Sequence, residues 1–263
     1  MDNILDQPTA HPNGRRTIDE VLTNGYNMSI GEAWSRGTDI WKKNIGGFVL
    51  FLIIALIVQM VCSFIPFVGS IASTFITGPA MVAGFFMAAY KLSMFGKVEQ
   101  SDYTFGFKKI ADNALFVLIK IVVSILIFIP VIISIISEIA LLVGLNYKSP
   151  EGIKQVVAIL MPLIGVVLIC ALVLLLVSVL FMLVYQLINV YGLNAITAIK
   201  VSSKVVMKNY FSFILLAIVC GLINIAGGLC LLVGLLFTIP LTYCVLYAAY
   251  EQIFENKSAA TAV

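Results

Sequence analysis

Two apolar runs lie back to back between Lys42 and Tyr90, and no charged residue occurs from Asn44 to Tyr90. A helix of roughly 20 apolar residues crosses the hydrocarbon core of a bilayer. Inside that core, only helices and closed barrels satisfy every backbone hydrogen bond. The stretch therefore predicts two membrane-spanning helices, at residues 45–66 and 70–95, joined by a tight uncharged turn.

Composition extends this interpretation to the whole chain. Hydrophobic residues make up 61% of the 263 residues and charged residues only 11%, whereas soluble domains carry about 25% charged residues. We expect an all-α, polytopic integral membrane protein with six transmembrane helices. The spans are predicted at about residues 45–66, 70–95, 114–145, 155–190, 210–227 and 231–252. The third and fourth are longer than a bilayer requires, and they contain Pro130 and Pro162.

The six spans pair into three helical hairpins, and each hairpin follows a segment with the pattern of an amphipathic helix at a membrane surface. The expected organisation is a flexible cytoplasmic tail (residues 1–28), a six-helix membrane domain (29–255) and a second cytoplasmic tail (256–263). The hairpins, each with its leading segment, take residues 29–97, 98–192 and 193–255.

The first leading segment, residues 29–43, carries Trp34 and Trp41 at helical spacing on one face. Tryptophan is enriched where a membrane meets water, so these two residues are predicted interface anchors. A cytosolic helix that packs against its own protein shows the same pattern and is an equal alternative.

The basic residues predict the orientation. Fourteen of the sixteen fall on the side of the two termini, and only Lys148 and Lys154 fall on the opposite side. Because an excess of lysine and arginine marks the cytoplasmic side, we expect both termini in the cytoplasm. Seven lysines on that side are candidates for anionic lipid headgroups, although topology alone explains their charge equally well. They are Lys42, Lys43, Lys108, Lys109, Lys200, Lys204 and Lys208.

An internal repeat relates the first and last hairpins. A shift of 165 residues aligns several residues of the kind that mark turns and helix ends. The two copies would both enter the membrane from the cytoplasm. A duplication of this kind predicts a parallel repeat about an axis normal to the bilayer. The matches include Lys43-Asn44 with Lys208-Asn209, Val68-Gly69 with Val233-Gly234 and, after a four-residue gap, Thr77-x-Pro79 with Thr238-x-Pro240.

Polar side chains inside the spans are candidate functional residues, because burying them in lipid is costly. Gln59 and Asn224 occupy matching positions of the repeat. Hydrogen bonds across helices that hold the hairpins together are the leading interpretation of these amides, and the polar wall of a pathway is the alternative.

Two charged residues also fall within predicted spans. Glu138 predicts either an ion pair with Lys148 or Lys154 near the outer interface, or a proton or cation site. Lys120 lies near the inner end of the third span, so its amine is expected to extend to the headgroups.

No catalytic or metal-binding set stands out in the sequence. His11 is the only histidine and lies in the N-terminal tail, and the five cysteines lie inside apolar runs. Nucleophilic, acid–base and metal catalysis each need several such side chains together. We therefore expect no enzymatic activity, no cofactor, no metal and no nucleic-acid partner. Membrane lipid and other membrane proteins, or a second copy of the chain, are the expected partners.

Two stretches carry a resemblance to a known group of proteins: TGPAMVAGFF with the later MFGKVEQSDYTFGFKK, and AIKVSSKVVMKNYFSFILL with TIPLTYCVLYAAY. Over roughly residues 29 to 255 the chain is similar to bacterial polytopic membrane proteins of unknown function, and to the membrane domain attached to some glycerophosphodiester phosphodiesterases. The resemblance implies a bacterial cytoplasmic membrane and transfers no catalytic residue. Similar chains are sometimes labelled carotene monooxygenases, but a single histidine cannot supply the iron site that this chemistry needs.

The leading functional expectation is a non-enzymatic integral membrane protein that acts as an accessory or scaffold subunit and contacts anionic lipid. The alternative is a transporter or permease for a lipid-like or small apolar molecule. A water-accessible crevice at Gln59 and Asn224 would favour transport, whereas a close-packed centre would favour the scaffold.

Overall fold

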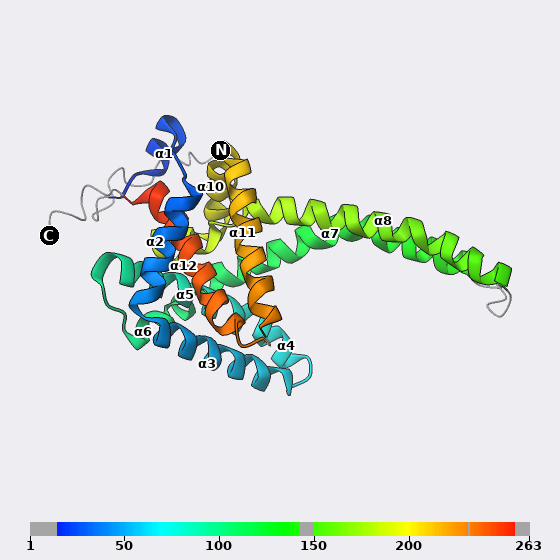
Figure 1. The fold of residues 1–263 in the computed structure, drawn as a ribbon, viewed down its shortest axis with the longest axis horizontal. Helices are drawn as coiled ribbons and strands as arrows, with labels where there is room; N and C mark the ends of the chain where they lie inside the picture. Colours follow the sequence, from blue (N-terminus) through cyan, green and yellow to red (C-terminus); the bar gives the residue numbers. More distant parts are fainter. Residues whose placement is uncertain (1–14, 143–149, 231, 256–263) are drawn as a thin grey trace. The chain divides into compact units, whose positions relative to one another are not determined.

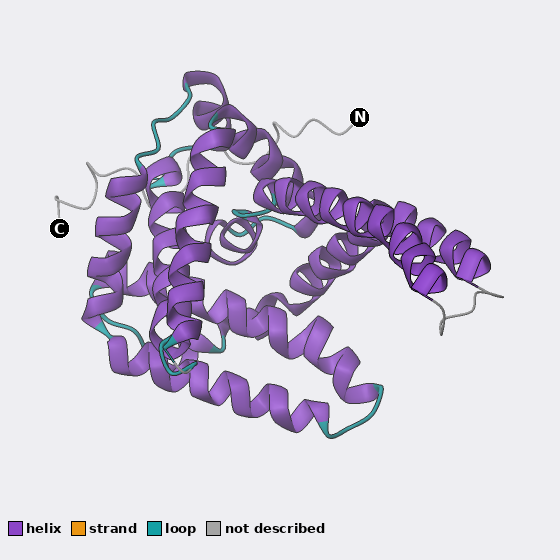
Figure 2. Cartoon of the chain, turned by 45° about the vertical axis from the view of Figure 1, so that its right-hand side comes forward, coloured by secondary structure: helices purple, strands orange, loops and turns teal. Residues whose placement is uncertain are grey.

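A computed structural model describes residues 15–142, 150–230 and 232–255, and the secondary-structure elements in these ranges are helices (Figures 1 and 2). This confirms the all-α expectation. The elements are α1 (Ile18–Asn24), α2 (Ile30–Lys43), α3 (Ile45–Ser63), α4 (Val68–Ala72), the π-helix η1 (Ser73–Thr77), α5 (Gly78–Phe95), α6 (Gln100–Tyr103), the 3-10 helix η2 (Phe105–Lys109), α7 (Ile110–Leu142), α8 (Pro150–Leu180), α9 (Val184–Gln186), the π-helix η3 (Leu187–Tyr191), α10 (Ala195–Lys208), α11 (Tyr210–Leu229) and α12 (Leu235–Phe254).

Five helical segments of the described residues are long and apolar enough to cross a membrane. They are Ile45–Ser63, Val68–Phe95, Phe105–Ile139, Lys154–Tyr191 and Tyr210–Leu229. These segments coincide with the first five predicted spans, so the chain has the character of a membrane protein.

The sixth predicted span corresponds to α12, which is not among the five. Its 20 residues give a helix of about 30 Å, which is long enough to cross a bilayer, but its last turn is polar at Glu251 and Gln252. A sixth span, the pairing into hairpins and the side on which the termini lie therefore stay predictions.

The chain divides into two compact units by its internal contacts, and the membrane domain expected over residues 29–255 stays a prediction. The smaller unit, residues 118–178, holds most of α7 and α8, which run side by side in both views (Figures 1 and 2). Val131 and Cys170 are buried in it, while most of its other large apolar side chains are exposed. With 33 and 31 residues, the two helices are about 45 to 50 Å long, which exceeds the roughly 30 Å of a hydrocarbon core.

The larger unit contains the rest of the described chain, and its helices contact one another in a closed ring. Each predicted surface segment lies against the helix that ends the preceding predicted hairpin: α6 and η2 against α5, and α10 against α9 and η3. The first such segment, α2, lies against α12, the last helix of the chain, in the most extensive contact between two elements. The ends of the sequence therefore close the ring.

Residues without a bulky side chain permit these close contacts. A Cβ added at Gly37 of α2 would lie 2.5 Å from Val245 Cα of α12, and one added at Gly106 of η2 would meet the backbone of Ala80 in α5. Real Cβ atoms essentially never come so close, so both positions require glycine. In α10 the corresponding contact uses a hydroxyl, because Ser202 Oγ donates to Leu180 O at 2.6 Å.

The leading segment of the second hairpin, which begins at residue 98, is not one continuous helix in the structure. Glu99 and Asp102 cap α6 reciprocally, and α6 ends after one turn at Tyr103. The tight 3-10 turns of η2 follow, and α7 begins at Ile110. Because the segment bends at this break, it comes close to the backbone of α5 at Gly84 and Gly106. A straight helix of this length would not follow α5 in this way.

The helix boundaries repeat at the interval that the sequence predicts. A shift of 165 residues carries α2 onto α10 at both ends and the first residue of α3 onto the first residue of α11. The breaks between these helices also match, because Asn44 N donates to Trp41 O and Asn209 N donates to Val206 O. The same shift relates Phe67 and Leu232, the residues other than glycine in the described chain that have a positive φ, at 58° and 63°.

The structure differs from the expectation of a flexible tail over residues 1–28. Residues 15–28 are ordered: a capping box at Thr17 starts α1, and Val21 and Met28 are buried at 0% and 6% exposure. Residues 1–14, which include His11, and the tail 256–263 lie outside the described residues. So does the loop 143–149, which contains Lys148.

Candidate functional site

The two amides at matching repeat positions each bond to the neighbouring helical element. Gln59 Oε1 in α3 accepts a hydrogen bond from Ser73 Oγ in η1. Asn224 Nδ2 in α11 donates to Thr242 Oγ1 in α12 at 2.9 Å. The Asn224 bond joins α11 to α12, which follow each other in sequence, and the Gln59 bond joins α3 to η1 across α4. Each bond therefore lies within one predicted hairpin and not between two hairpins.

Several polar atoms near these amides have no hydrogen-bond partner among the described residues. Asn224 Oδ1 is buried and unpaired there, as are Thr77 Oγ1 and Thr238 Oγ1, which the predicted repeat aligns with each other. A buried polar atom without a hydrogen bond costs about 1 to 3 kcal/mol. The strain is repeated in both copies, one turn or less from Pro79 and Pro240.

The two charged candidates lie in the smaller unit. Lys120 is exposed, and Glu138 Oε2 is buried with no hydrogen-bond partner among the described residues. Lys154 is exposed, and no ion pair joins it to Glu138 within the described part of the chain. The pairing predicted with Lys148 falls outside that part.

Trp34 and Trp41 are partly buried and pack against the hydrophobic core of the larger unit. The Nε1 atom of Trp41 is buried and unpaired. Their surroundings fit the alternative in which α2 packs against its own protein. Contact with lipid at the remaining exposed edges stays a prediction.

The seven candidate lysines have different surroundings. Lys42, Lys108, Lys200 and Lys204 are exposed, and Lys109 is partly buried. Lys43 Nζ donates to Leu92 O at 3.1 Å and Lys208 Nζ donates to Leu22 O. These two carbonyls lie in the last turns of α5 and α1, where the backbone lacks helical partners and a cation is favourable.

A polar junction that sequence reasoning missed lies where the inner helices end. Arg15 Nε donates to Glu255 Oε1 at 2.7 Å, and Arg15 Nη1 donates to Val190 O at 2.6 Å. The guanidinium also lies over the Tyr90 ring, 4.9 Å from its centroid. Arg15 therefore touches α5, η3 and the residue that follows α12. The side chains of the ion pair are only 4% and 6% exposed.

Electrostatics at this junction depends on the pairing. Burial raises the pKa of the Glu255 carboxyl above its ordinary value, and the charge of Arg15 acts in the opposite direction. A buried carboxylate without its cation would be strongly destabilising. The Arg15 guanidinium is thus the group that permits Glu255 to remain charged in the closed ring.

A second ion pair lies one turn earlier on α12. Arg36 of α2 binds both carboxylate oxygens of Glu251, with Nε to Oε2 at 3.0 Å and Nη2 to Oε1 at 3.2 Å. Arg36 Nη2 also donates to Ser93 Oγ of α5 at 2.8 Å. The hydrogen bond from Glu251 is the largest cause of a raised Arg36 pKa.

The use of arginine was the signal for both pairs. The chain has three arginines, Arg15, Arg16 and Arg36, all near its N-terminus. All three bind the end of α12 or the residue after it, since Arg16 N donates to Phe254 O at 2.8 Å. Arginine suits buried, bidentate contacts better than lysine does. Because the other basic residues of the chain are lysines, the three arginines indicate positions where such contacts form.

The centre of the larger unit is closely packed where α5, η3 and α12 converge. Tyr247 and Tyr250 are fully buried, and the Tyr90 and Tyr247 ring centroids lie 6.3 Å apart. Tyr191 and Tyr250 flank Phe254, with centroids at 5.5 and 5.1 Å. The small side chains of this region are buried at 0% or 1% exposure: Ala88, Ala89, Ala248 and Ala249.

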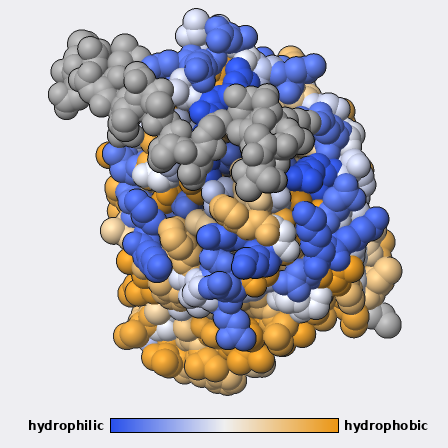
Figure 3. Space-filling view, turned by 90° about the vertical axis from the view of Figure 1, so that its left-hand side faces the viewer, coloured by the Kyte–Doolittle hydropathy of each residue, from blue (hydrophilic) through white to orange (hydrophobic). Residues whose placement is uncertain are grey.

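Three cavities of the larger unit lie away from this centre. One lies between α1 and α10, one beside Lys91 and Asp102, and one between α3 and α6. Neither Gln59 nor Asn224 lines any of these three. On the face shown in Figure 3, hydrophilic side chains gather in the upper part and hydrophobic side chains cover the lower part.

Comparison of the chain with protein-family models, with curated proteins and with solved structures found no match. The resemblance to membrane domains of glycerophosphodiester phosphodiesterases therefore stays a prediction, and function has to be argued from the residues themselves.

Proposed function

We propose that the chain is a non-enzymatic integral membrane protein that acts as a scaffold or accessory subunit of a bacterial cytoplasmic membrane. In this proposal six helices cross the bilayer as three hairpins, and both termini lie in the cytoplasm. The first and last hairpins are copies from one duplication, which the shared boundaries of α2 with α10 support.

The close packing at the centre of the larger unit carries the proposal. Buried tyrosines and alanines fill the place where the inner helices meet, and Arg15 covers its end. Dense packing of this kind holds helices in fixed positions. A protein that transports a solute needs a route for it at this place, whereas a scaffold needs a rigid body that presents its outer surface.

One observation favours a transporter or permease for a lipid-like or small apolar molecule as the second candidate. The buried atoms Thr77 Oγ1, Thr238 Oγ1 and Asn224 Oδ1 lack partners, and η1 and η3 are π-helices, which occur frequently at functional sites. Unpaired groups beside irregular helices would find partners if the inner helices moved apart and admitted water or a solute.

Cysteine accessibility distinguishes the two candidates without knowledge of a substrate. The full chain, with its five native cysteines replaced by alanine, would carry Gln59→Cys, Thr238→Cys or Asn224→Cys in native membrane vesicles. A charged methanethiosulfonate reacts only with thiols that water reaches. The scaffold predicts no reaction at these positions and full reaction at Ser35→Cys, an exposed control in α2.

Rapid modification at Thr238→Cys and Asn224→Cys would overturn the scaffold in favour of a pathway. The topology has its own test, in which a reporter fused after Val263 should be active only in its cytoplasmic form. A reporter on the outside would contradict the proposed orientation, whatever the cysteines show.

A further inference from the structure

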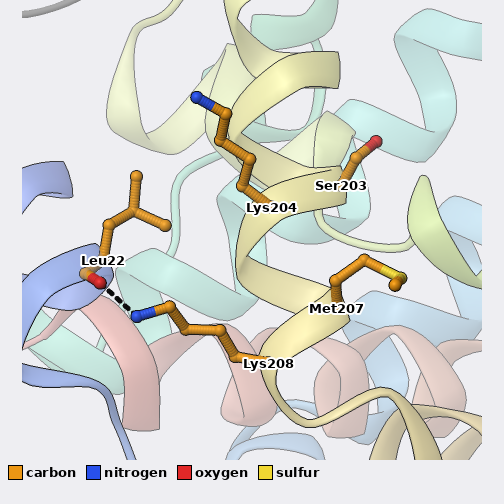
Figure 4. A pocket seen from close by; sticks show the side chains of 5 residues that line it. All are labelled: Leu22, Ser203, Lys204, Met207 and Lys208. Atoms are coloured by element: carbon orange, nitrogen blue, oxygen red, sulfur yellow. Dashed lines mark hydrogen bonds between the residues drawn. The ribbon is translucent and has the colours of Figure 1, made fainter.

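A groove lies between α1 and α10 in the larger unit (Figure 4). Its volume is about 570 Å³, and its lining consists of Leu22, Ser203, Lys204, Met207 and Lys208. Lys204 and Lys208 extend to the α1 side of α10, whereas Ser203 and Met207 extend to the other side (Figure 4). The groove therefore combines two cationic groups with two apolar side chains.

The two lysines retain donors for a ligand. Lys208 Nζ uses one hydrogen for Leu22 O at the end of α1, which fixes the direction of its side chain. Lys204 is exposed, and the ion pairs formed within the described residues do not include it. Lys200, one turn before Lys204, is also exposed and adds positive charge to the same face.

The position of the groove along the chain ties it to the membrane boundary. The candidate span α11 begins at Tyr210, two residues after Lys208. Large apolar residues share the exposed surface with the lysines, since Ile196 is 53%, Met207 60% and Phe211 85% exposed. Cationic and apolar side chains mixed on one helix face are typical of an element that lies in the headgroup region.

The matching helix of the first copy lacks this surface. The 165-residue shift places Ser35 on Lys200 and Asp39 on Lys204, and both α2 residues are exposed. The two helices have the same boundaries and nearly the same backbone breaks, so the difference lies in surface charge alone. In place of Ser35 and Asp39 of α2, α10 carries two exposed lysines close to the start of a candidate span.

We propose that this groove binds the phosphate group of an anionic phospholipid of the surrounding leaflet. Lys204 and Lys208 would donate to the phosphate oxygens, and Leu22 and Met207 would contact the glycerol and the first acyl carbons. The apolar lining favours a lipid over inorganic phosphate, which would gain nothing from it. The site rests on the membrane placement of α11 in the proposed function and assigns that function a specific lipid class.

The test measures lipid binding by the purified full chain in a neutral detergent, with native mass spectrometry resolving each bound lipid. Phosphatidylglycerol and phosphatidylcholine serve as anionic and zwitterionic probes. A lysine near an anionic surface contributes about a fivefold factor in affinity. Lys204→Asp, which removes one positive charge and adds a negative one, should therefore weaken phosphatidylglycerol binding roughly 25-fold and leave phosphatidylcholine unchanged.

The matched control is Lys97→Asp, an exposed lysine between α5 and α6 with the same change of charge, and it should alter the affinity less than twofold. Met207→Gln should weaken binding of the intact lipid but not of inorganic phosphate. Equal losses in Lys204→Asp and Lys97→Asp would overturn the site, because they would show a diffuse charge effect. Competition by millimolar inorganic phosphate would overturn the assignment to lipid.

The reporter after Val263 separates this inference from the proposed function. A cytoplasmic reporter together with an unchanged lipid affinity in Lys204→Asp would contradict the lipid site in the groove and leave the proposed function intact. A reporter on the outside would remove the membrane placement on which the groove depends, and would contradict both.

Discussion

Two contacts of the larger unit have the same construction and opposite charge. In one, α6 and η2 lie against α5, with Gly106 at the point of closest approach, and Lys91 of α5 lies 4.0 Å from Asp102 of α6. In the other, α2 lies against α12, with Gly37 at closest approach. There the inner helix supplies the acid and the surface helix the base, because Glu251 of α12 pairs with Arg36 of α2.

The reversal indicates how each surface segment selects its inner helix. At a shift of 160 residues, Ala88-Ala89-Tyr90 matches Ala248-Ala249-Tyr250, and this register places Lys91 of α5 on Glu251 of α12. The helix α2 touches α5 only at its side, where Arg36 donates to Ser93. In the place of α6, Arg36 would approach Lys91, and like charges would oppose the contact. The opposite charges at these equivalent positions therefore favour α6 against α5 and α2 against α12, and they disfavour the exchanged pairing. Repulsive pairs have the same role in other specific interfaces.

The closing contact also has a component that the α5 contact lacks, the buried pair of Arg15 and Glu255. Phe95 takes the place of Glu255 in the same alignment. The closing contact joins the two ends of the sequence, so chain connectivity does not hold it together. Additional polar bonds compensate for this.

The largest expected effect comes from removing the buried pair of Arg15 and Glu255. Arg15→Ala leaves Glu255 buried without its cation, and breaking a buried ion pair in this way costs about 3 to 5 kcal/mol. Unfolding of the full chain in detergent, followed by the fluorescence of Trp34 and Trp41, measures the change. Arg15→Ala combined with Glu255→Gln should recover part of the loss, and a loss below about 1 kcal/mol would mean that the pair is solvated.

The second prediction concerns the glycines of both contacts. Gly37→Ser and Gly106→Ser each place a side chain against the backbone of the neighbouring helix, and overpacking of this kind costs about 1 to 3 kcal/mol. Gly31→Ser is the matched control in α2, because a Cβ at Gly31 meets no atom within 4 Å. If Gly37→Ser unfolded at the same denaturant concentration as Gly31→Ser, the close approach of α2 and α12 would be wrong.

The third prediction reverses the charges of each contact in turn. Arg36→Glu should destabilise the chain by about 2 kcal/mol, because it opposes Glu251 in a partly buried bidentate pair. Lys91→Glu should cost less than about 1 kcal/mol, since its pair is longer and more exposed. The double variant Arg36→Glu with Glu251→Arg should restore most of the stability. Failure to do so would show that the pair does not specify the closing contact.

The smallest expected effect is the pH dependence of the stability that Arg15→Ala loses. Burial raises the pKa of Glu255, and loss of Arg15, which lowers it, raises the pKa further. A carboxyl whose folded pKa exceeds its unfolded value contributes stability below the unfolded value, and that stability is lost as pH rises through the folded pKa. Arg15→Ala should therefore lose less stability at pH 5 than at pH 8.

Each unit by which the pKa rises corresponds to about 1.4 kcal/mol. Measurement of the free energy of unfolding of the wild type and of Arg15→Ala at both values of pH checks this. Equal losses at pH 5 and pH 8 would mean that Glu255 does not titrate in the variant. Glu255→Gln should have no such dependence.

Local patterns predicted the parts of the fold that depend on neighbours in sequence. The apolar runs located five spans, and the first leading segment, predicted at residues 29–43, corresponds to α2. Such features are predictable because hydrophobic length and periodicity act over a few turns.

The candidate sites were less predictable, because their partners are distant. Gln59 and Asn224 were expected to join hairpins, whereas each bonds to a helical element of its own predicted hairpin. The break between α6 and η2 was not apparent, because the reciprocal cap of Glu99 and Asp102 marks the start of α6 and does not show that the helix ends at Tyr103. Arg15 was placed in a flexible tail because a short polar segment shows no periodicity.

The sequence by itself determined that this chain is helical and apolar over most of its length, and it predicted a repeat at an interval of 165 residues. The tertiary structure alone decided that the ring closes through α2 and α12, and that Arg15 lies at the junction of three inner helices. The physical reason is that Arg15 and Glu255 are 240 residues apart. A buried charge becomes favourable only when the fold delivers its counterion, and no local pattern records that meeting.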